Sequence, residues 1–354
     1  MIGWDGISRQ FVNCYALQEL FFKGHYLVNS PQELQLETEI SKYTGAEASA
    51  VTNCGMAAIG AVVNFLIQPG DCVLFSKALY PGTIRLAKNL GQKIDMIKVH
   101  FIDPADVVSL QEMIEQEQPR FYFFEMIGNS PGMPVVNYKA TLDILTGTET
   151  VAVVDTTLIP SFHSCSQENW GVKVIEVGSL SKWESGGVVA GGRISGSAEI
   201  IQGIKDYDYY RQVVMQPIVA EQIVLARLER DFPRYCENAI AAAEILANYP
   251  SKVEVFYPGL VSHPDYNLVH SQFDGLAGGI FYALMKGGKE AAIQLADKLS
   301  AYDHWSIAPS FGAEDWRIIP LGVIAEDYDP ALIRISAGHS KEGVDILEDV
   351  LTQL

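Results

Sequence analysis

The sequence lacks the patterns that mark exported, membrane-embedded or nucleic-acid-binding proteins. Its 354 residues contain no uncharged apolar run close to the roughly 18 residues that span a bilayer. Met1–Phe22 has no basic segment followed by an apolar core and a cleavage site. Basic residues are scarce, since 25 Lys and Arg against 43 Asp and Glu give a formal net charge of −18, and such a field opposes binding to DNA, RNA or anionic lipid. We therefore expect a soluble cytoplasmic protein with no nucleic-acid or membrane partner.

Cysteine is also scarce and irregularly placed. No CxxC or Cys/His spacing occurs, so the sequence indicates neither a zinc site nor a disulfide framework. We expect no metal, and a reducing compartment suits this cysteine usage. The five cysteines are Cys14, Cys54, Cys72, Cys165 and Cys236.

The first part of the chain alternates between strand-like and helix-like segments, without an internal repeat. This alternation predicts a largely parallel sheet with crossover helices. The predicted strands are Ala48–Thr52, Cys72–Phe75, Lys93–Val99, Arg120–Glu125, Val151–Asp155 and Val174–Val177. The predicted helices are Leu36–Tyr43, Gly55–Ile67, Thr83–Leu90 and Ala105–Gln116.

After about Gln212 the pattern of strand-like and helix-like segments changes, and the new pattern predicts a smaller α/β domain packed on the first. We expect an N-terminal arm over residues 1–25, a large domain over 26–212 and a small domain over 213–354. Helices are predicted at Pro217–Arg230, Arg234–Tyr249 and after Ser340, and strands at Lys252–Tyr257 and Gly278–Lys286.

Two charged residues follow apolar strands. Lys182 stands among small and apolar neighbours, and partial desolvation there lowers the pKa of an amine and makes it a nucleophile. Asp155 ends an apolar strand, where open α/β sheets keep their ligand sites, and a buried anion requires a cationic partner. By itself each has an ordinary alternative: a surface lysine at a strand end, and an aspartate in a turn or helix cap.

Three further positions suit a ligand. Gly55 and Met56 begin a helix after a strand, where free amides bind phosphate. Tyr80 lies in a turn from which its ring could stack on a heterocycle. Arg334 lies within a β-branched strand and suits a substrate carboxylate. A turn glycine, a packed tyrosine and a structural ion pair are the commoner uses of such residues.

In their order along the chain, these segments resemble the Cys/Met-metabolism family of pyridoxal 5′-phosphate (PLP) enzymes, which includes cystathionine γ-synthase, cystathionine γ-lyase and methionine γ-lyase. The resemblance runs from about Tyr26 to the C-terminus. It implies the aspartate aminotransferase-like fold, fold type I of PLP-dependent enzymes. The segments that carry it are 53–58 (N-C-G-M-A-A), 80–83 (Y-P-G-T), 125–130 (E-M-I-G-N-S), 154–157 (V-D-T-T), 179–183 (S-L-S-K-W), 310–312 (S-F-G) and 334–338 (R-I-S-A-G).

The resemblance implies a role for each matched residue. Lys182 would carry PLP as a Schiff base, Asp155 would hold the pyridinium nitrogen, and Asn129 the phenolic oxygen. Arg334, with Ser310 and Asn129, would bind the substrate carboxylate. The phosphate ligands would be the amides of Gly55 and Met56 and the hydroxyls of Ser179 and Ser181. Tyr80 would stack on the ring, and Tyr26 would reach the phosphate of the neighbouring subunit's cofactor. Both tyrosines would also assist Lys182 in catalysis.

The sequence departs from the family pattern at two positions. Val28 stands where members usually have an arginine that reaches the neighbouring subunit's phosphate, and Pro309 stands where synthases and lyases often have glutamate. The N-terminal arm is also short. These changes favour a specialised substrate.

The resemblance implies γ- or β-elimination or replacement on an L-amino acid that is sulfur-containing, O-activated or γ-halogenated. It also implies a homodimer with shared active sites, paired into a tetramer. An aminotransferase on the same cofactor and a non-catalytic protein of this fold are the alternatives.

Overall fold

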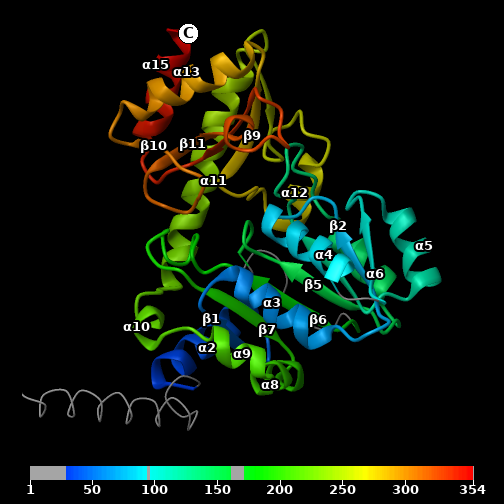
Figure 1. Cartoon of the computed structure of the whole chain (residues 1–354). Coiled ribbons are helices and arrows are strands. Elements are labelled where there is room, and N and C mark those ends of the chain that lie inside the picture. Colours follow the sequence, from blue (N-terminus) through cyan, green and yellow to red (C-terminus); the bar gives the residue numbers. More distant parts are fainter. Residues whose placement is uncertain (1–28, 94–95, 161–170, 354) are drawn as a thin grey trace, which may run out of the picture.

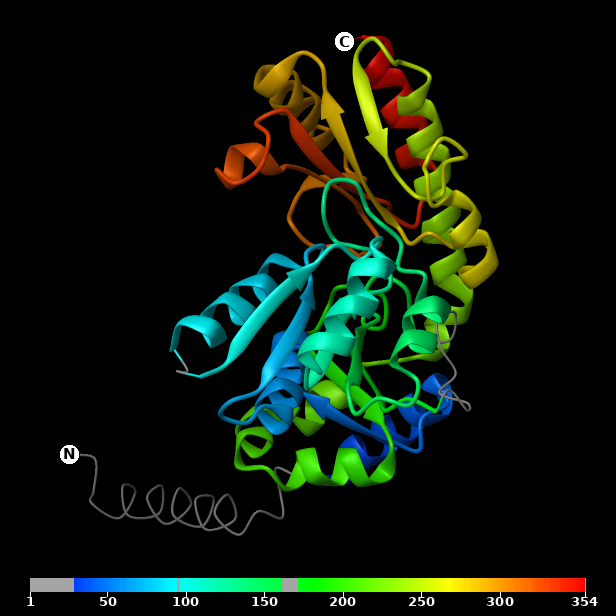
Figure 2. The same cartoon turned by 90° about the vertical axis from the view of Figure 1, so that its right-hand side faces the viewer.

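The computed structural model describes residues 29–93, 96–160 and 171–353. Tyr26 and Val28 lie outside these ranges, so their predicted roles stay predictions. The described chain forms a seven-stranded sheet and a five-stranded sheet. Figures 1 and 2 show the second sheet stacked above the first, with the C-terminus at the far end of the upper part.

The seven-stranded sheet has the order β1-β7-β6-β5-β4-β2-β3. The strands from β2 to β6 pair in parallel, whereas β7 is antiparallel to both of its neighbours. The predicted largely parallel sheet is therefore confirmed. The strands are β1 (Ala48–Thr52), β2 (Cys72–Ser76), β3 (Lys98–Ile102), β4 (Phe121–Glu125), β5 (Val151–Asp155), β6 (Val174–Gly178) and β7 (Gly192–Gly196).

Helices cover both faces of this sheet, as a continuously apolar strand such as β4 requires. Phe121 and Phe123 face the core formed with α3, α4, α8 and α9, and Tyr122 and Phe124 face the core formed with α2, α5 and α6. The helices are α2 (Pro31–Thr44), α3 (Gly55–Leu66), α4 (Pro81–Lys93), α5 (Val107–Glu117), α6 (Tyr138–Leu145), α8 (Ala198–Asp206) and α9 (Asp208–Val213).

The two ends of α2 show how individual residues determine where a helix begins and ends. Ser30 and Glu33 form a capping box, and Pro31 occupies the first turn, where its missing N–H costs nothing. Gly45 ends the helix with φ of 70°, in the left-handed region that glycine adopts readily.

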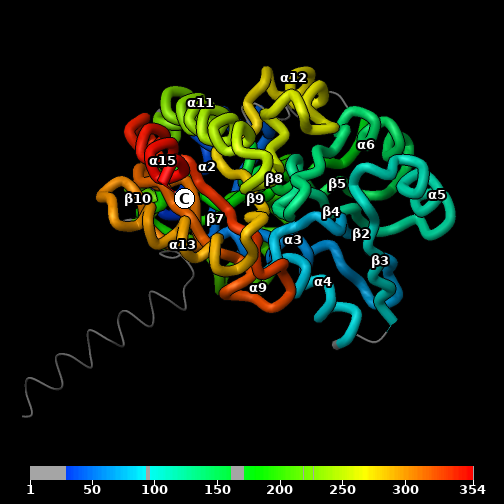
Figure 3. Tube along the Cα trace, turned by 90° about the horizontal axis from the view of Figure 1, so that it is seen from above, coloured from blue at the N-terminus to red at the C-terminus, as the bar shows by residue number. Residues whose placement is uncertain are grey.

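The five-stranded sheet has the order β10-β11-β12-β9-β8. α15 lies between α11 and α13 (Figure 3), and these three helices pack together on the sheet. The strands are β8 (Val253–Phe256), β9 (Ile280–Met285), β10 (Trp305–Ile307), β11 (Trp316–Pro320) and β12 (Leu332–Ser336). The helices are α10 (Pro217–Ala220), α11 (Ala226–Ala247), α12 (Tyr266–Phe273), α13 (Gly288–Ser300), α14 (Leu321–Ile324) and α15 (Glu342–Thr352).

Three predicted elements were wrong in their limits. The strand predicted at Lys93–Val99 begins only at Lys98, because α4 continues to Lys93. The two helices predicted on either side of Pro233 are the short α10 and one long α11, which contains that proline. Proline opposes an interior helical position by about 3 kcal/mol, and the buried face of α11, which includes Phe232, Cys236 and Ala239, offsets this cost. Among the described residues, no helix is long and apolar enough to cross a membrane.

Candidate active site

Four neighbouring strands bring polar side chains to one edge of the large sheet. Glu125 ends β4, Asp155 ends β5, Ser179 follows β6, and Tyr80 follows β2. The carboxyl ends of adjacent parallel strands form the crevice where open α/β sheets bind ligands. Residues far apart in the sequence therefore meet at a single place.

A cavity of about 310 Å³ lies at this edge, between the sheet and residues 309–311 and 334 of the small domain. Ligand pockets generally begin at roughly this volume. The cavity is lined by every predicted site residue except Tyr26: Gly55, Met56, Tyr80, Asn129, Asp155, Ser179, Ser181, Lys182, Ser310 and Arg334.

Lys182 projects its amine into the cavity. Its Nζ donates to Ser310 Oγ at 3.0 Å and lies 4.9 Å from the centroid of the Phe311 ring. Burial, with the positive charges of Arg334 and Arg317, lowers the pKa of Lys182 to about 8. The amine is therefore available in its neutral, nucleophilic form near neutral pH.

Asp155 and Glu125 are direct neighbours in the β4–β5 register, and both are buried. Burial and the charge of Asp155 raise the pKa of Glu125 well above its ordinary value. Burial also raises the pKa of Asp155, but the Thr157 amide, which donates to Oδ1 at 2.9 Å, and Arg193 lower it. Two adjacent buried carboxylates do not ionise together readily, so we assign the proton to Glu125 and the charge to Asp155.

The opposite end of the cavity has the donors that a phosphate requires. α3 begins at Gly55, and its N-cap residue Cys54 makes no side-chain cap, so its first amides lack intrahelical partners. A Cβ on Gly55 would lie 2.7 Å from Ser179 Cβ, which keeps this approach open only to glycine. Ser181 also lines the cavity, but its hydroxyl is bonded to the backbone of Gly191 in both directions, at 2.9 and 3.1 Å.

The sequence did not single out several residues of this site. Glu125 has the same signal as Asp155, a carboxylate at the end of an apolar strand, and could have been found by it. Thr157 accepts from the Ser179 amide at 2.9 Å. Tyr282 is a tyrosine in an apolar strand, a pattern without a functional signal, yet its hydroxyl donates to Asn129 Oδ1 at 2.8 Å.

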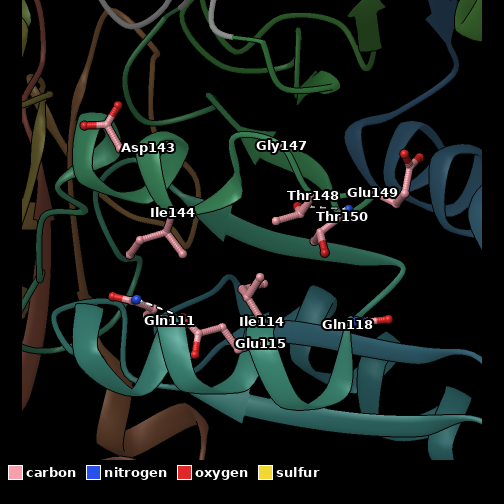
Figure 4. A pocket seen from close by; sticks show the side chains of 10 residues that line it. All are labelled: Gln111, Ile114, Glu115, Gln118, Asp143, Ile144, Gly147, Thr148, Glu149 and Thr150. Carbon is pink, nitrogen blue, oxygen red and sulfur yellow. Dashed lines mark hydrogen bonds between the residues drawn. The ribbon is translucent and has the colours of Figure 1, made fainter.

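A larger cavity of about 810 Å³ lies elsewhere, between α5 and the turn from α6 to β5 (Figure 4). Gln118 and Thr150 line it just before β4 and β5, so it opens at the amino ends of the strands. Its side chains are acidic, polar or aliphatic, including Glu115, Asp143 and Glu149, and none is basic. Among its described lining residues there is no lysine, cysteine or serine to act as a nucleophile and no cation to bind an anion.

A group of possible metal ligands, Cys72, His100 and Glu117, meets at the edge of the large sheet, which sequence spacing did not reveal. Lys98 already supplies a cation to Glu117, with Nζ 3.2 Å from the carboxylate. Burial and Glu117 raise the pKa of the Cys72 thiol, whereas a metal needs the thiolate. The chemistry of the described residues is therefore concentrated in the cavity beside Lys182.

The donor set of that cavity fits PLP. An amine with a lowered pKa suits the aldehyde, a buried aspartate suits a protonated ring nitrogen, and the start of α3 suits a phosphate. The two packed α/β units also meet over this crevice, as they do in the aspartate aminotransferase-like fold. Fold and site together define a PLP-dependent enzyme of the aspartate aminotransferase-like fold.

The comparisons with known proteins agree. The description "Cys/Met metabolism PLP-dependent enzyme" matches residues 25–353, and the chain belongs to this family. L-methionine gamma-lyase of Pseudomonas putida is 29% identical over 95% of this chain and 86% of its own length. Cystathionine gamma-synthase 1, chloroplastic, of Arabidopsis thaliana is 28% identical over 82% of this chain and 51% of its own length.

Solved structures share the fold. The crystal structure of cystathionine gamma synthase from Xanthomonas oryzae pv. oryzae, in complex with aminoacrylate and cysteine, superposes with a TM-score of 0.83. The two sequences are 23% identical, and the superposition covers 92% of this chain and 86% of the solved chain. The predicted fold, family and cofactor are thereby confirmed.

Proposed function

We propose that this protein catalyses elimination or replacement at the γ-carbon of an L-amino acid, with Lys182 as the residue that binds PLP and moves protons. The observation that carries the proposal is the Lys182 amine, with a pKa of about 8, in the same cavity as Asp155 and Arg334. The relatives named as γ-lyase and γ-synthase support the γ-position.

Each wall of the cavity has a part in this proposal. When bound, PLP supplies a ring that withdraws electrons from the substrate α-carbon. Asp155 keeps the ring nitrogen protonated, and Gly55, Met56, Ser179 and Ser181 bind the phosphate. Ser181 must then turn its hydroxyl away from the Gly191 carbonyl.

The substrate side is formed by both domains. Arg334, held by a hydrogen bond to the Pro309 carbonyl, binds the α-carboxylate together with Ser310. Neutral Lys182 would remove the α-proton and deliver it to the bound cofactor. The amine, neutral again, would then remove a proton from the β-carbon, so that the γ-substituent can leave with the electron pair of its bond. Tyr80, whose side chain remains 44% exposed at the mouth, stacks on the ring and, with Tyr26, assists the departure.

Another cavity, next to the site, supports the hypothesis that the reaction is replacement on a substrate with an acidic γ-substituent. It measures about 560 Å³ and shares Met56 and Tyr80 with the site, and Arg85 lines it. A guanidinium there suits the carboxylate of an acyl leaving group. Arg85→Met should raise KM for O-succinylhomoserine and leave KM for methionine unchanged, and equal effects on both would contradict this choice.

The test of the main proposal is spectroscopic and chemical. Purified protein with PLP should show the long-wavelength absorbance band of a lysine-bound cofactor, and Lys182→Ala should lose it. Methionine should then yield a thiol, ammonia and a keto acid, or an activated homoserine should yield a thioether with added cysteine. Keto acid formed with stoichiometric transfer of the amino group would identify an aminotransferase instead. A band that survives in Lys182→Ala would refute the assignment of the lysine.

We also propose a homodimer with shared sites, paired into a tetramer, in the cytoplasm. Val188, in the turn after Lys182, is 77% exposed, and Val224 is 48% exposed, so apolar side chains near the site are available to a second copy. Light scattering should give a multiple of the 38.9 kDa chain. A mass of one chain would exclude the shared site.

A further inference from the structure

Tyr282 joins the two domains across the active site. It lies on β9 opposite Arg334 of β12 in the antiparallel register, and it is 1% exposed. Its hydroxyl donates to Oδ1 of Asn129, which follows β4 of the large domain, at 2.8 Å. Burial raises the pKa of Tyr282 to about 12, so the hydroxyl keeps its proton at any pH of interest.

The hydrogen bond of Tyr282 has a fixed direction. The charge of Arg334 lowers the pKa of the Tyr282 hydroxyl, and a guanidinium has only donors, so the hydroxyl proton is not directed to Arg334. This single proton is donated to Asn129 Oδ1. The Asn129 amide then presents its oxygen to Tyr282, which leaves its NH₂ group for the cavity that Asn129 lines.

We propose that Tyr282 is a positioning residue, which turns the Asn129 amide so that its NH₂ group donates to the phenolic oxygen of the cofactor and which responds to the charge of Arg334. The proposal rests on the proposed roles of Asn129 and Arg334. It gives a hydrogen-bond sequence from Tyr282 to Asn129 to the cofactor, beside the charge of Arg334.

This arrangement couples substrate binding to the cofactor. A carboxylate that binds Arg334 offsets the positive charge that lowers the pKa of Tyr282. The Tyr282 hydroxyl then becomes less acidic and a poorer donor to Asn129. The hydrogen bond that the Asn129 amide donates then also changes in strength. Its acceptor, the phenolic oxygen, lies next to the nitrogen that links Lys182 to PLP.

The variant Tyr282→Phe tests the proposal, because it removes one buried oxygen and keeps the ring. A donor at the phenolic oxygen disfavours positive charge on the neighbouring Lys182 nitrogen. Loss of its orientation should therefore move the spectral pKa of the lysine-bound cofactor upward by roughly 0.5 to 1. Butyrate, an unreactive carboxylate, should shift this spectral pKa in the wild type and shift it less in Tyr282→Phe.

Tyr257→Phe is the matched control. Tyr257 is also fully buried in the small domain, and its hydroxyl donates to the Gly278 carbonyl at 2.6 Å. This variant should lose stability without moving the spectral pKa. Asn129→Ala should raise the spectral pKa without any change at position 282, and adding Tyr282→Phe to it should have no further effect.

The outcomes separate the two proposals. A wild type without a lysine-bound band would overturn the proposed function. A normal band with an unmoved spectral pKa in Tyr282→Phe, or in Asn129→Ala if the tyrosine variant does not fold, would overturn the role of Tyr282 alone. So would an effect of Tyr282→Phe that persists in the Asn129→Ala background.

Discussion

Arg193 provides a test of the buried charges that needs no cofactor. Its side chain on β7 is completely buried, with Glu176 at 3.5 Å and Glu184 at 3.7 Å, and both carboxylates are 0–1% exposed. It also donates to Thr156 Oγ1 at 2.5 Å. Arg193→Met would keep most of the side-chain volume and remove the cation that these groups surround.

The expected loss is large because the carboxylates remain. Removing one partner of a buried ion pair costs about 3–5 kcal/mol, a substantial part of the roughly 5–15 kcal/mol that stabilises a domain. Burial already raises the pKa of Glu184, and Arg193 is the main charge that lowers it. In the variant the folded-state pKa rises further above the unfolded value, so the folded state retains protons more strongly. The deficit should therefore be smallest at acidic pH and grow as pH rises through that pKa.

Urea denaturation of the cofactor-free protein, followed by circular dichroism at about pH 5.5 and about pH 8, measures this deficit. Arg230→Met is the control, because Arg230 is 74% exposed and its partner Asp231 keeps Arg227 as a second cation. It should move the midpoint far less. Adding Glu184→Gln to Arg193→Met should recover part of the stability. A loss below about 1 kcal/mol at both pH values would refute the reasoning, because only exposed pairs are worth so little.

Three further outcomes follow from the site. Cofactor binding by the apo-protein should accelerate as pH rises toward about 8, the pKa of Lys182. Arg317→Met should move the pH at which the binding rate is half-maximal upward. Stopped-flow absorbance measures this rate, and an unmoved half-maximal pH would contradict the role of Arg317. Arg334→Lys should raise KM roughly ten- to a hundredfold through a lost charged hydrogen bond, and an unchanged KM would exclude Arg334 from the carboxylate site. Glu125→Gln should retain activity within about threefold, whereas Asp155→Asn should lower kcat about a hundredfold or more. If Glu125→Gln has the larger effect, Asp155 carries the proton and Glu125 the charge.

The interior of the large sheet could be predicted because its strands are short apolar runs between turn residues. β7 could not, since Gly192–Gly196 has no apolar run. It is buried as a strand because Arg193 finds its partners on β6 and in the turn after Lys182, which no local pattern reveals. β3 was misplaced for a related reason: it is the edge strand, and only Ile102 of its five residues is buried.

The site was predictable where each role belongs to a local motif. Asp155 ends β5, and Gly55 and Lys182 come within four residues after β1 and β6, so the strand prediction also placed these residues at one edge of the sheet. Tyr282 was not predictable, because its function depends on Asn129, 153 residues away in the chain, and on the packing of two domains. The direction of its hydrogen bonds is a property of the assembled site.

The charge of the chain and the charge of the site have opposite signs. The formal net charge of −18 opposes the binding of extended polyanions, but a cavity responds to the groups within a few ångströms of it. Arg334 and Arg317 act directly on Lys182, and the start of α3 adds its partial positive charge. With the proton assigned to Glu125, Asp155 is the charged carboxylate among the described residues of the lining. The cavity thus offers cations and amides at the ends, where a phosphate and a substrate carboxylate would bind, and a single anion in the middle, where a protonated ring nitrogen would lie.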